Sequence, residues 1–328
     1  MTATTTTKPT APSIRFGPFL VVVLGGLFMN LLDISIVNVA IGSLRRELHA
    51  DGAELQLIVS GYVLAYAVLL ITGARLGDRL GHRRMFEAGL LGFVVASAAC
   101  GLAWSPVALI VFRVLLGVAA AAMLPQVMSL IQICCPPGPV RARALAWYGL
   151  VLALGTVAGQ LLGGVILQVD VGGIGWRGVF LVNIPIGLAL LVLARRHLPN
   201  GTARAQVPLD LAGVISLGAA LALLIVPLVL GHENHWPLWG FAAWAVGGVG
   251  VAIFIVIERR AVAPVISGAL LRTPGLAPGI GVLLLVISSY AAYLFCLSVH
   301  LQTALGMSPL ATGLAFAPLA AGFAAASP

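Results

Sequence analysis

Residues 73–85 read GARLGDRLGHRRM and indicate the fold class most clearly. It places one aspartate and four arginines, with glycines at positions 77 and 81, between two long apolar runs. Only 9% of the 328 residues are charged, so this connection holds an unusual share of the fixed charge. The pattern is typical of a short turn between two helices that cross a membrane.

The composition of the whole chain supports that interpretation. Hydrophobic residues make up 60% of the sequence, and the mean hydropathy is +1.09. A soluble domain normally carries about a quarter charged residues, so there is too little polar surface here for a water-soluble globule. We therefore expect an all-α membrane protein in which lipid is the solvent for most side chains.

Several other classes of protein are excluded by the sequence. The net charge of +8 lies in short clusters between apolar runs, not in a stripe with aromatics, so no nucleic-acid partner is expected. The chain has no GxxxxGK[ST] loop, which argues against ATP-driven transport. We expect free thiols and no metal site, because metal-ligand spacing is absent from the four cysteines, Cys100, Cys134, Cys135 and Cys296.

The apolar runs predict about nine complete transmembrane helices plus part of a tenth. The polar segment 1–17 before them is expected to be disordered and cytoplasmic, without a removed signal peptide. The last run begins near residue 309 and is still apolar at Pro328, so we expect the chain to stop inside a span. The complete spans fall near 18–41, 57–77, 86–104, 107–133, 143–168, 178–194, 209–231, 238–257 and 276–300.

The basic residues predict the orientation of these spans. Fourteen lie on one set of flanks and only three on the other, in correct alternation, so the N-terminus is predicted to be cytoplasmic. The three on the outer flanks are Arg45, Arg46 and Arg177. Four tryptophans fall at the outer ends, where interfacial aromatics are expected: Trp104, Trp176, Trp236 and Trp239.

Two opposite charges lie inside predicted spans. A charge in the middle of the bilayer costs about 2.5–3.5 kcal/mol on insertion scales, so such a residue is a functional candidate. At about 1.5 Å per residue, Asp33 lies about 8 Å from the outer edge of the hydrocarbon core, and Arg113 about 9 Å. The two can pair if their helices are neighbours. The alternatives are a structural Asp33 held by hydroxyl groups and an Arg113 that extends to the outer headgroups.

Two glycine patterns allow two interpretations each. The arginines in residues 73–85 help to set the topology, and Asp78 between Gly77 and Gly81 also suggests a charge-assisted latch between helices. Along the fifth span, Gly155, Gly159 and Gly163 recur every four residues. That stripe fits either close helix packing or a hinge.

These stretches together resemble the major facilitator superfamily, in particular its fourteen-span drug:proton antiporters. LGDRLGHRR, residues 76–84, resembles the signature loop between the second and third spans, with His82 where a basic residue is usual. GTVAGQLLGG, residues 155–164, resembles the fifth-span antiporter motif, with Gln160 in the proline position. WRGVFLVNIPIG, residues 176–187, resembles the start of the sixth span. The first-span and fourth-span motifs, around Asp33 and Arg113, are similar to those of the same branch.

The resemblance implies a domain organisation and a role for each motif. It implies an N-terminal six-helix bundle over 18–200, two linking transmembrane helices over 201–260, and the incomplete start of a C-terminal bundle over 261–328. Proton coupling or substrate contact would fall to Asp33, Arg113, Asn30 and Asn38. The cytoplasmic gate would use Gly77, Asp78, Arg79, Gly81, Arg83 and Arg84. The antiporter-motif helix would use Gly155, Gly159, Gln160, Gly163 and Gly164. The start of the sixth span would use Trp176, Arg177, Phe180, Asn183 and Pro185.

The function implied by the resemblance is proton-coupled efflux of amphipathic, drug-like or antibiotic compounds across a bacterial cell membrane. Its partners would be the lipid bilayer, protons and a small amphipathic substrate, and it would need no cofactor beyond the proton gradient. The open alternatives are export of one metabolite, such as an amino acid or a self-made antibiotic, and a non-transporting membrane sensor or fragment. An enzyme is disfavoured, because the one His/Glu cluster, His232, Glu233 and His235, lies in an outer loop.

Overall fold

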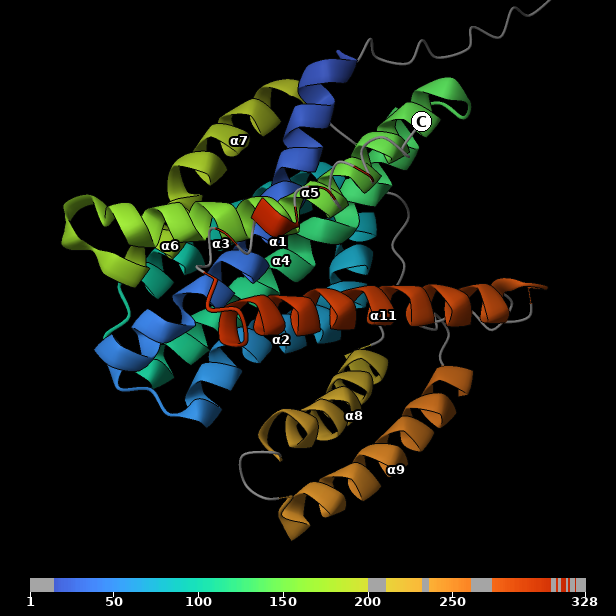
Figure 1. Cartoon of the computed structure of the whole chain (residues 1–328). Coiled ribbons are helices and arrows are strands. Elements are labelled where there is room, and N and C mark those ends of the chain that lie inside the picture. The colour runs from blue at the N-terminus through green and yellow to red at the C-terminus, as the bar shows by residue number, and fades with distance from the viewer. Residues whose placement is uncertain are drawn as a thin grey trace, which may run out of the picture.

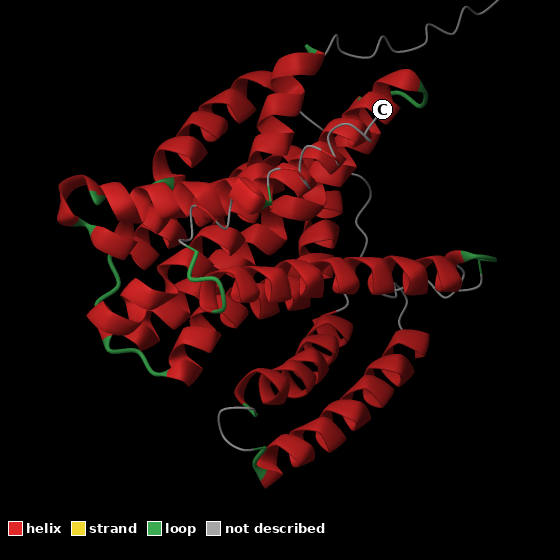
Figure 2. Cartoon of the chain, viewed as in Figure 1, coloured by secondary structure: helices red, strands yellow, loops and turns green. Residues whose placement is uncertain are grey.

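In the computed structural model the described residues are 15–199, 211–231, 236–260 and 273–307, with a few positions beyond. They form helices joined by short loops, and none of them belongs to a strand (Figure 2). The all-α fold class is therefore confirmed. The N-terminal residues 1–14, the His232–His235 cluster and most of the predicted tenth span lie outside the described residues.

The helices extend past the predicted spans at most of their ends. Six described helices are long and apolar enough to cross a membrane, or seven if the bent α5 is one span; the segment Gly175–His197, which contains α6 and α7, counts as one of the six. The apolar parts of α8 and α11 are shorter, so the count of nine complete spans stays a prediction. The helices are α1 (Phe16–Leu48), α2 (Gly52–Leu80), α3 (His82–Gly101), α4 (Pro106–Cys134), α5 (Pro139–Val169), α6 (Gly178–Leu181), α7 (Asn183–His197), α8 (Leu211–Leu230), α9 (Leu238–Arg260) and α11 (Leu276–Thr303).

Local sequence explains where the helices begin and end. Asp51 and Glu54 form a reciprocal capping box at the start of α2, and Ser105 caps α4 just before Pro106. The charged stretch around residue 78 is helical up to Leu80, and Gly81 alone separates α2 from α3. Gly81 has φ +97°, a conformation that favours glycine, which explains a glycine at this turn.

α1 packs against α2, α4, α5, α6 and α7, and 16 of its 33 residues are buried (Figure 1). α2 and α3 both lie against α4, while α5 and α7 lie against α1. Glycines allow the closest of these approaches: a Cβ at Gly73 of α2 would overlap the carbonyl oxygen of Ala121 on α4. A Cβ at Gly89 of α3 would lie 2.7 Å from the backbone nitrogen of Met123.

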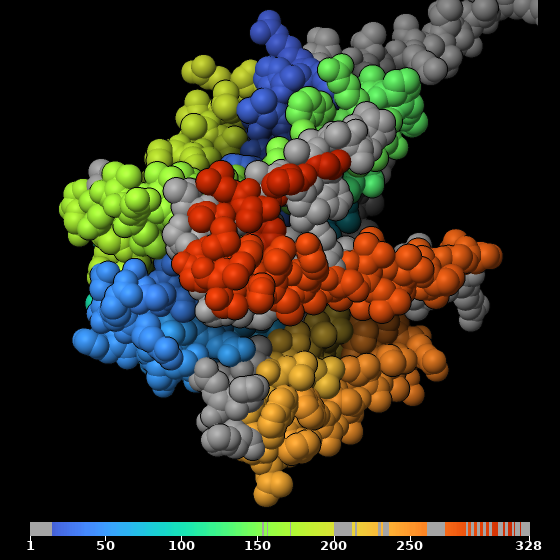
Figure 3. All heavy atoms as spheres, viewed as in Figure 1, coloured from blue at the N-terminus to red at the C-terminus, as the bar shows by residue number. Residues whose placement is uncertain are grey.

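α8 and α9 form a helical pair beside this bundle. α8 packs on α2, and the Trp244 indole of α9 donates to the carbonyl oxygen of Leu224 on α8 at 3.1 Å. α11 lies across the front of the molecule in the view of Figure 3, with most of its described side chains exposed.

The outward faces of the helices are apolar, in contrast to a soluble protein. Large aliphatic side chains such as Val95, Val111 and Leu188 are about half exposed or more. The buried polar residues lie instead inside the bundle. This inverted distribution is what a bilayer as solvent requires.

Candidate functional site

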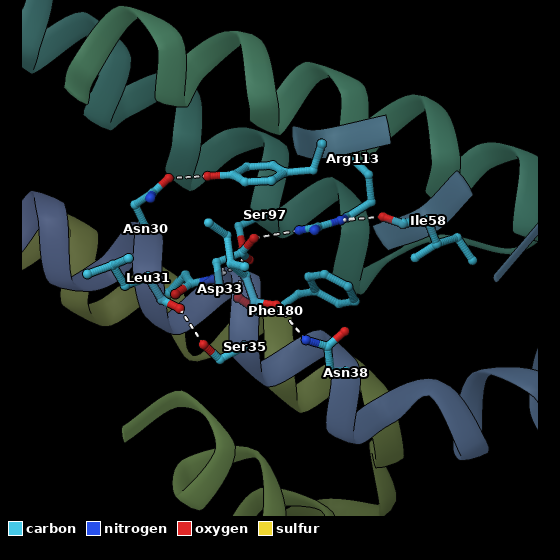
Figure 4. Close-up of polar contacts among 12 residues, drawn as sticks. Asn30, Leu31, Asp33, Ser35, Asn38, Ile58, Ser97, Arg113 and Phe180 are labelled. Carbon is cyan, nitrogen blue, oxygen red and sulfur yellow. Dashed lines mark hydrogen bonds and ion pairs between the residues drawn. The ribbon is translucent and has the colours of Figure 1, made fainter. Parts of the chain in front are cut away.

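Asp33 of α1 and Arg113 of α4 form an ion pair inside the bundle. Arg113 Nη1 lies 2.5 Å from Asp33 Oδ2, and the two side chains are 1% and 0% exposed (Figure 4). The helical-rise estimate placed them at similar depth, and the structure brings them into direct contact. Neither side chain faces outward, so Arg113 does not extend to the outer headgroups in this structure.

Arg113 is held by three further groups. Its Nε donates to the carbonyl oxygen of Ile58 on α2 at 2.9 Å. Its guanidinium lies over the Tyr62 ring, 4.5 Å from the centroid, and 6.0 Å from the centroid of Phe180. The buried cation is therefore satisfied by a carboxylate, a carbonyl and aromatic faces from three different helices.

The second carboxylate oxygen of Asp33 has a separate partner. Asn183, the first residue of α7, donates from Nδ2 to Asp33 Oδ1 at 3.1 Å and to Ser97 Oγ at 3.0 Å. Ser97 of α3 in turn donates to the carbonyl oxygen of Phe180 at 2.9 Å. All of these side chains are buried, so the carboxylate connects α4 on one side with α7 and α3 on the other.

The two first-span asparagines have different surroundings. Asn30 is buried, and its Oδ1 accepts a hydrogen bond from the Tyr62 hydroxyl. Asn38 is exposed, and its Nδ2 donates to the carbonyl oxygen of Ile34, one turn earlier on α1, at 3.3 Å. The structure therefore joins Asn30 to the ion pair through the Tyr62 ring, and it does not bring Asn38 into that cluster.

The sequence-based prediction included Asn183 only as part of the sixth-span start, and it did not include Ser97 or Tyr62. Ser97 stands in the small-residue run VASAAC and Tyr62 in SGYVLAY, where nothing in the spacing marks either residue. A buried Arg–Asp pair needs extra hydrogen-bond partners. Polar residues at the same depth on other spans are therefore the signal by which Ser97 and Tyr62 could have been found.

The residues of the signature stretch point in several directions. Arg83 donates from Nε to Glu87 at 2.8 Å, from Nη1 to the carbonyl of Leu198 at 2.7 Å, and from Nη2 to the carbonyl of Arg195 at 2.9 Å. Arg79 and Arg84 are exposed. Arg83 thus binds the C-terminal end of α7, where a cation is favourable.

Gly77 lies against Gln126, a polar residue that the sequence analysis did not identify, and Asp78 is connected to it through His82. The Asp78 carboxylate is half exposed, and its oxygen lies 3.5 Å from His82 Nε2. His82 Nδ1 lies 2.8 Å from Oε1 of Gln126, a fully buried residue of α4 whose Nε2 donates to the carbonyl of Gly73 at 2.8 Å. A Cβ at Gly77 would overlap the Gln126 amide. A latch between Asp78 and the arginines stays a prediction.

The glycines of α5 pack directly on the helix that carries Asp33. A Cβ at Gly155 would lie 2.7 Å from Leu31, one at Gly159 2.7 Å from the carbonyl oxygen of Leu32, and one at Gly163 2.9 Å from Ile36. Gln160 and Gly164 beside the stripe are half-buried. The segments Pro139–Leu152 and Val157–Val169 are inclined by 41°, so α5 both packs closely and bends.

The start of the sixth span differs in one respect from the expectation. Trp176 is fully buried inside the protein, because the Arg177 guanidinium covers it at 4.6 Å and Phe180 packs edge-on at 6.1 Å. Arg177 also lies 3.8 Å from Glu47 on α1. Pro185, in the first turn of α7, is exposed. Within the described residues there is no group of three or more His, Cys, Asp or Glu side chains that could hold a metal ion.

Comparison with known proteins decides the family. The family described as Major Facilitator Superfamily matches residues 23–328. This chain belongs to the Major Facilitator Superfamily. Its helices and its bacterial superfamily relatives agree with a multi-pass membrane protein.

Three superfamily relatives illustrate the likeness in sequence. The chain is 39% identical to the "Probable actinorhodin transporter" of Streptomyces coelicolor, covering 91% of this chain and 52% of the relative. It is 38% identical to the "Tetracenomycin C resistance and export protein" of Streptomyces glaucescens, covering 90% and 54%. It is 33% identical to the "Drug efflux pump JefA" of Mycobacterium tuberculosis, covering 92% and 59%. The chain therefore spans about half the length of the curated relatives it matches.

Solved superfamily structures share the fold at low sequence identity. The proton:xylose symporter XylE matches with a TM-score of 0.60 and 15% identity, covering 95% of this chain and 67% of that chain. A peptide transporter POT bound to sulfate matches with a TM-score of 0.57 and 18% identity, covering 93% and 68%. At these identities the likeness concerns the fold alone.

Proposed function

We propose that this chain belongs to a proton-coupled exporter of amphipathic, drug-like or antibiotic compounds. One observation carries the proposal: the fully buried ion pair of Asp33 and Arg113 inside a helical bundle. Such a pair is costly to maintain in place of apolar packing, which favours a role in function over one in stability. The names of the relatives, which include exporters and efflux pumps, support the same direction.

The geometry suggests how a proton could be coupled to movement. Asp33 neutralises Arg113 while the carboxylate is ionised, and a proton on Asp33 removes that compensation. Arg113 then retains the carbonyl of Ile58 and the Tyr62 ring on α2, so its interactions with α2 become dominant over those with α1. Because α1 carries Asp33 and packs on the bent α5, a change at this pair acts at the interface of several helices.

The remaining predictions from the sequence form part of the same proposal. The N-terminus is cytoplasmic, residues 18–200 form one six-helix bundle, 201–260 supply linking helices, and 261–328 begin a second bundle. Export proceeds by rocking of two such bundles about a central site. Residues Gly77 to Arg84 belong to the cytoplasmic gate.

The test is dye and drug export in cells that express the gene encoding this chain. We expect proton-driven efflux of a lipophilic cationic dye and a raised tolerance to amphipathic drugs, both lost in Asp33→Asn at equal membrane abundance. The matched control is Asp51→Asn, the same change at an exposed helix cap where asparagine also caps well. Equal efflux by Asp33→Asn under a proton gradient would show that the coupling assignment is wrong.

A second candidate is export of one self-made antibiotic. Three relatives at 37–39% identity are named for a single antibiotic each, whereas two named as a drug efflux pump and a multidrug resistance protein are 32–33% identical. Tolerance assays over a broad panel separate the two candidates. Protection against a single antibiotic favours the narrow exporter, and protection against unrelated amphipathic drugs favours the broad one.

A further inference from the structure

Asp33 has a different hydrogen-bond donor on each carboxylate oxygen. Oδ2 receives Arg113 Nη1 at 2.5 Å, and Oδ1 receives Asn183 Nδ2 at 3.1 Å. A guanidinium keeps its protons at any physiological pH. If Asp33 Oδ2 were protonated, its O–H and the N–H of Arg113 Nη1 would both be donors facing each other. A proton that neutralises this carboxyl therefore belongs on Oδ1, the side of Asn183.

The groups around the carboxyl leave Asn183 as the side chain that must respond. The titratable or charged groups that face Asp33 are Arg113 from α4, Tyr62 from α2 and Cys100 from α3. The phenol and the thiol carry no charge at neutral pH. α5 presents Gly159 to this part of α1, and α6 presents Phe180. Asn183 on α7 is the described neutral partner in direct contact with Oδ1.

The orientation of the Asn183 amide follows from its two neighbours. Both Asp33 Oδ1 and Ser97 Oγ act as acceptors toward it, because the Ser97 proton is donated to the Phe180 carbonyl at 2.9 Å. The amide therefore turns its NH2 group to both, and its own Oδ1 is buried with no hydrogen-bond partner among the described groups. A buried unsatisfied acceptor is costly, so this residue has an unused capacity to accept.

From this arrangement we infer that Asn183 is a positioning residue that binds both protonation states of Asp33 and passes the change to Ser97. This inference rests on the proposed proton coupling. With Asp33 ionised, the amide donates to the carboxylate. With a proton on Oδ1, Asp33 becomes a donor, the amide turns by half a rotation, and its oxygen accepts from Asp33. Ser97 Oγ then faces an oxygen and donates to it, which releases the Phe180 carbonyl.

The released carbonyl lies where the sixth span is already weakened. α6 ends at Leu181 and α7 begins at Asn183, while Val182 between them keeps helical dihedral angles, φ −61° and ψ −27°. Pro185 has no N–H to give to the Leu181 carbonyl, so that turn lacks one helical bond. Loss of the Ser97 bond at Phe180 would leave two neighbouring carbonyls at this junction without those donors. Protonation of Asp33 on α1 thereby changes the hydrogen bonding at the junction between α6 and α7. The change is transmitted by rearranged hydrogen bonds, and no second group is protonated or deprotonated.

The test is infrared difference spectroscopy of the purified full-length protein in lipid nanodiscs, taken across a pH titration. The C=O stretch of protonated Asp33 is identified as the carboxylic-acid band that disappears in Asp33→Asn. In Asn183→Leu the acid loses its acceptor, so the band should move to higher frequency. In Ser97→Ala the Asn183 oxygen accepts from Asp33 alone, so that bond strengthens and the band should move to lower frequency. Ser35→Ala, which removes a buried hydroxyl bonded to its own helix at Leu31, should leave the band in place.

The band is expected to move to higher frequency in Asn183→Leu and to lower frequency in Ser97→Ala. A general disturbance of the structure would not produce shifts of opposite sign. An unchanged band in Asn183→Leu, or a shift of both variants in one direction, overturns it. If Asn183→Leu does not fold, an unchanged or higher frequency in Ser97→Ala is sufficient to overturn it. Absence of any Asp33 band overturns the proton step of the proposed function as well. The expected shifts in a protein that exports nothing would reject the exporter and support the role of Asn183.

Discussion

Arg83, in the first turn of α3, donates from Nη1 to the carbonyl oxygen of Leu198, just beyond α7, at 2.7 Å. The residues are 115 positions apart, so an arginine of the charged connection 73–85 joins two distant parts of the bundle. Its neighbour Arg84 is exposed. Two adjacent arginines of one motif therefore have different structural surroundings.

This contrast predicts unequal effects of two matched substitutions. Arg83→Gln removes charge-assisted bonds to the end of α7 and should lower the free energy of unfolding by about 1–2 kcal/mol, allowing for partial exposure. Arg84→Gln removes the same charge from the same connection, so it has an equal effect on orientation. Thermal unfolding in detergent measures both. Equal losses in the two variants would mean that the α7 contact contributes nothing.

The Asp33–Arg113 pair predicts strong coupling in a double-mutant cycle. Asp33→Asn and Arg113→Met each leave an uncompensated buried partner and should cost about 3–5 kcal/mol. The double variant has no buried charge at this point, so its loss should be smaller than the sum of the single losses. Unfolding free energies of the four proteins provide the measurement, and strictly additive losses would contradict an energetically significant pair.

Two glycines of α2 that face α4 should differ sharply in tolerance. Gly73→Ala forces a methyl group into the backbone oxygen of Ala121, which cannot rotate away, so we expect a loss of about 3 kcal/mol or more. Gly61→Ala places its methyl 3.5 Å from Val114, an ordinary contact, and should be neutral or slightly stabilising. Folded yield on size-exclusion chromatography and melting temperature report both changes. Similar behaviour of the two variants would refute the close approach at Gly73.

The α5 stripe gives a fourth prediction, with a control on the same helix. Gly159→Ala sets a methyl 2.7 Å from the Leu32 carbonyl oxygen and should cost about 1–3 kcal/mol as α5 is pushed from α1. Gly149→Ala meets nothing within 4 Å and should gain about 0.5–1 kcal/mol from helix propensity. Stability is read from unfolding in detergent. A harmless Gly159→Ala would argue that α5 and α1 do not pack through this stripe.

One property of the site, the depth of each residue in the membrane, could be predicted because it depends only on position along one helix. Helical rise alone placed Asp33 and Arg113 at similar depth, and they are in contact. The same reasoning did not predict that Trp176, at the outer end of a span, is buried by Arg177 and Phe180. Depth is a property of one segment, whereas burial depends on what the other segments place around it.

The all-helical membrane class follows from the sequence alone, because hydropathy and charge act through the bilayer on each segment separately. Which polar groups meet depends on how the helices pack. Asn183 lies 150 positions from Asp33, and neither Ser97 nor Tyr62 carried any signal in its own span. The reason is that lipid-facing and protein-facing sides of a transmembrane helix are both apolar, so the sequence leaves the rotation of each helix undetermined. That rotation is set by packing, where glycines such as Gly73 and Gly159 admit a neighbouring backbone.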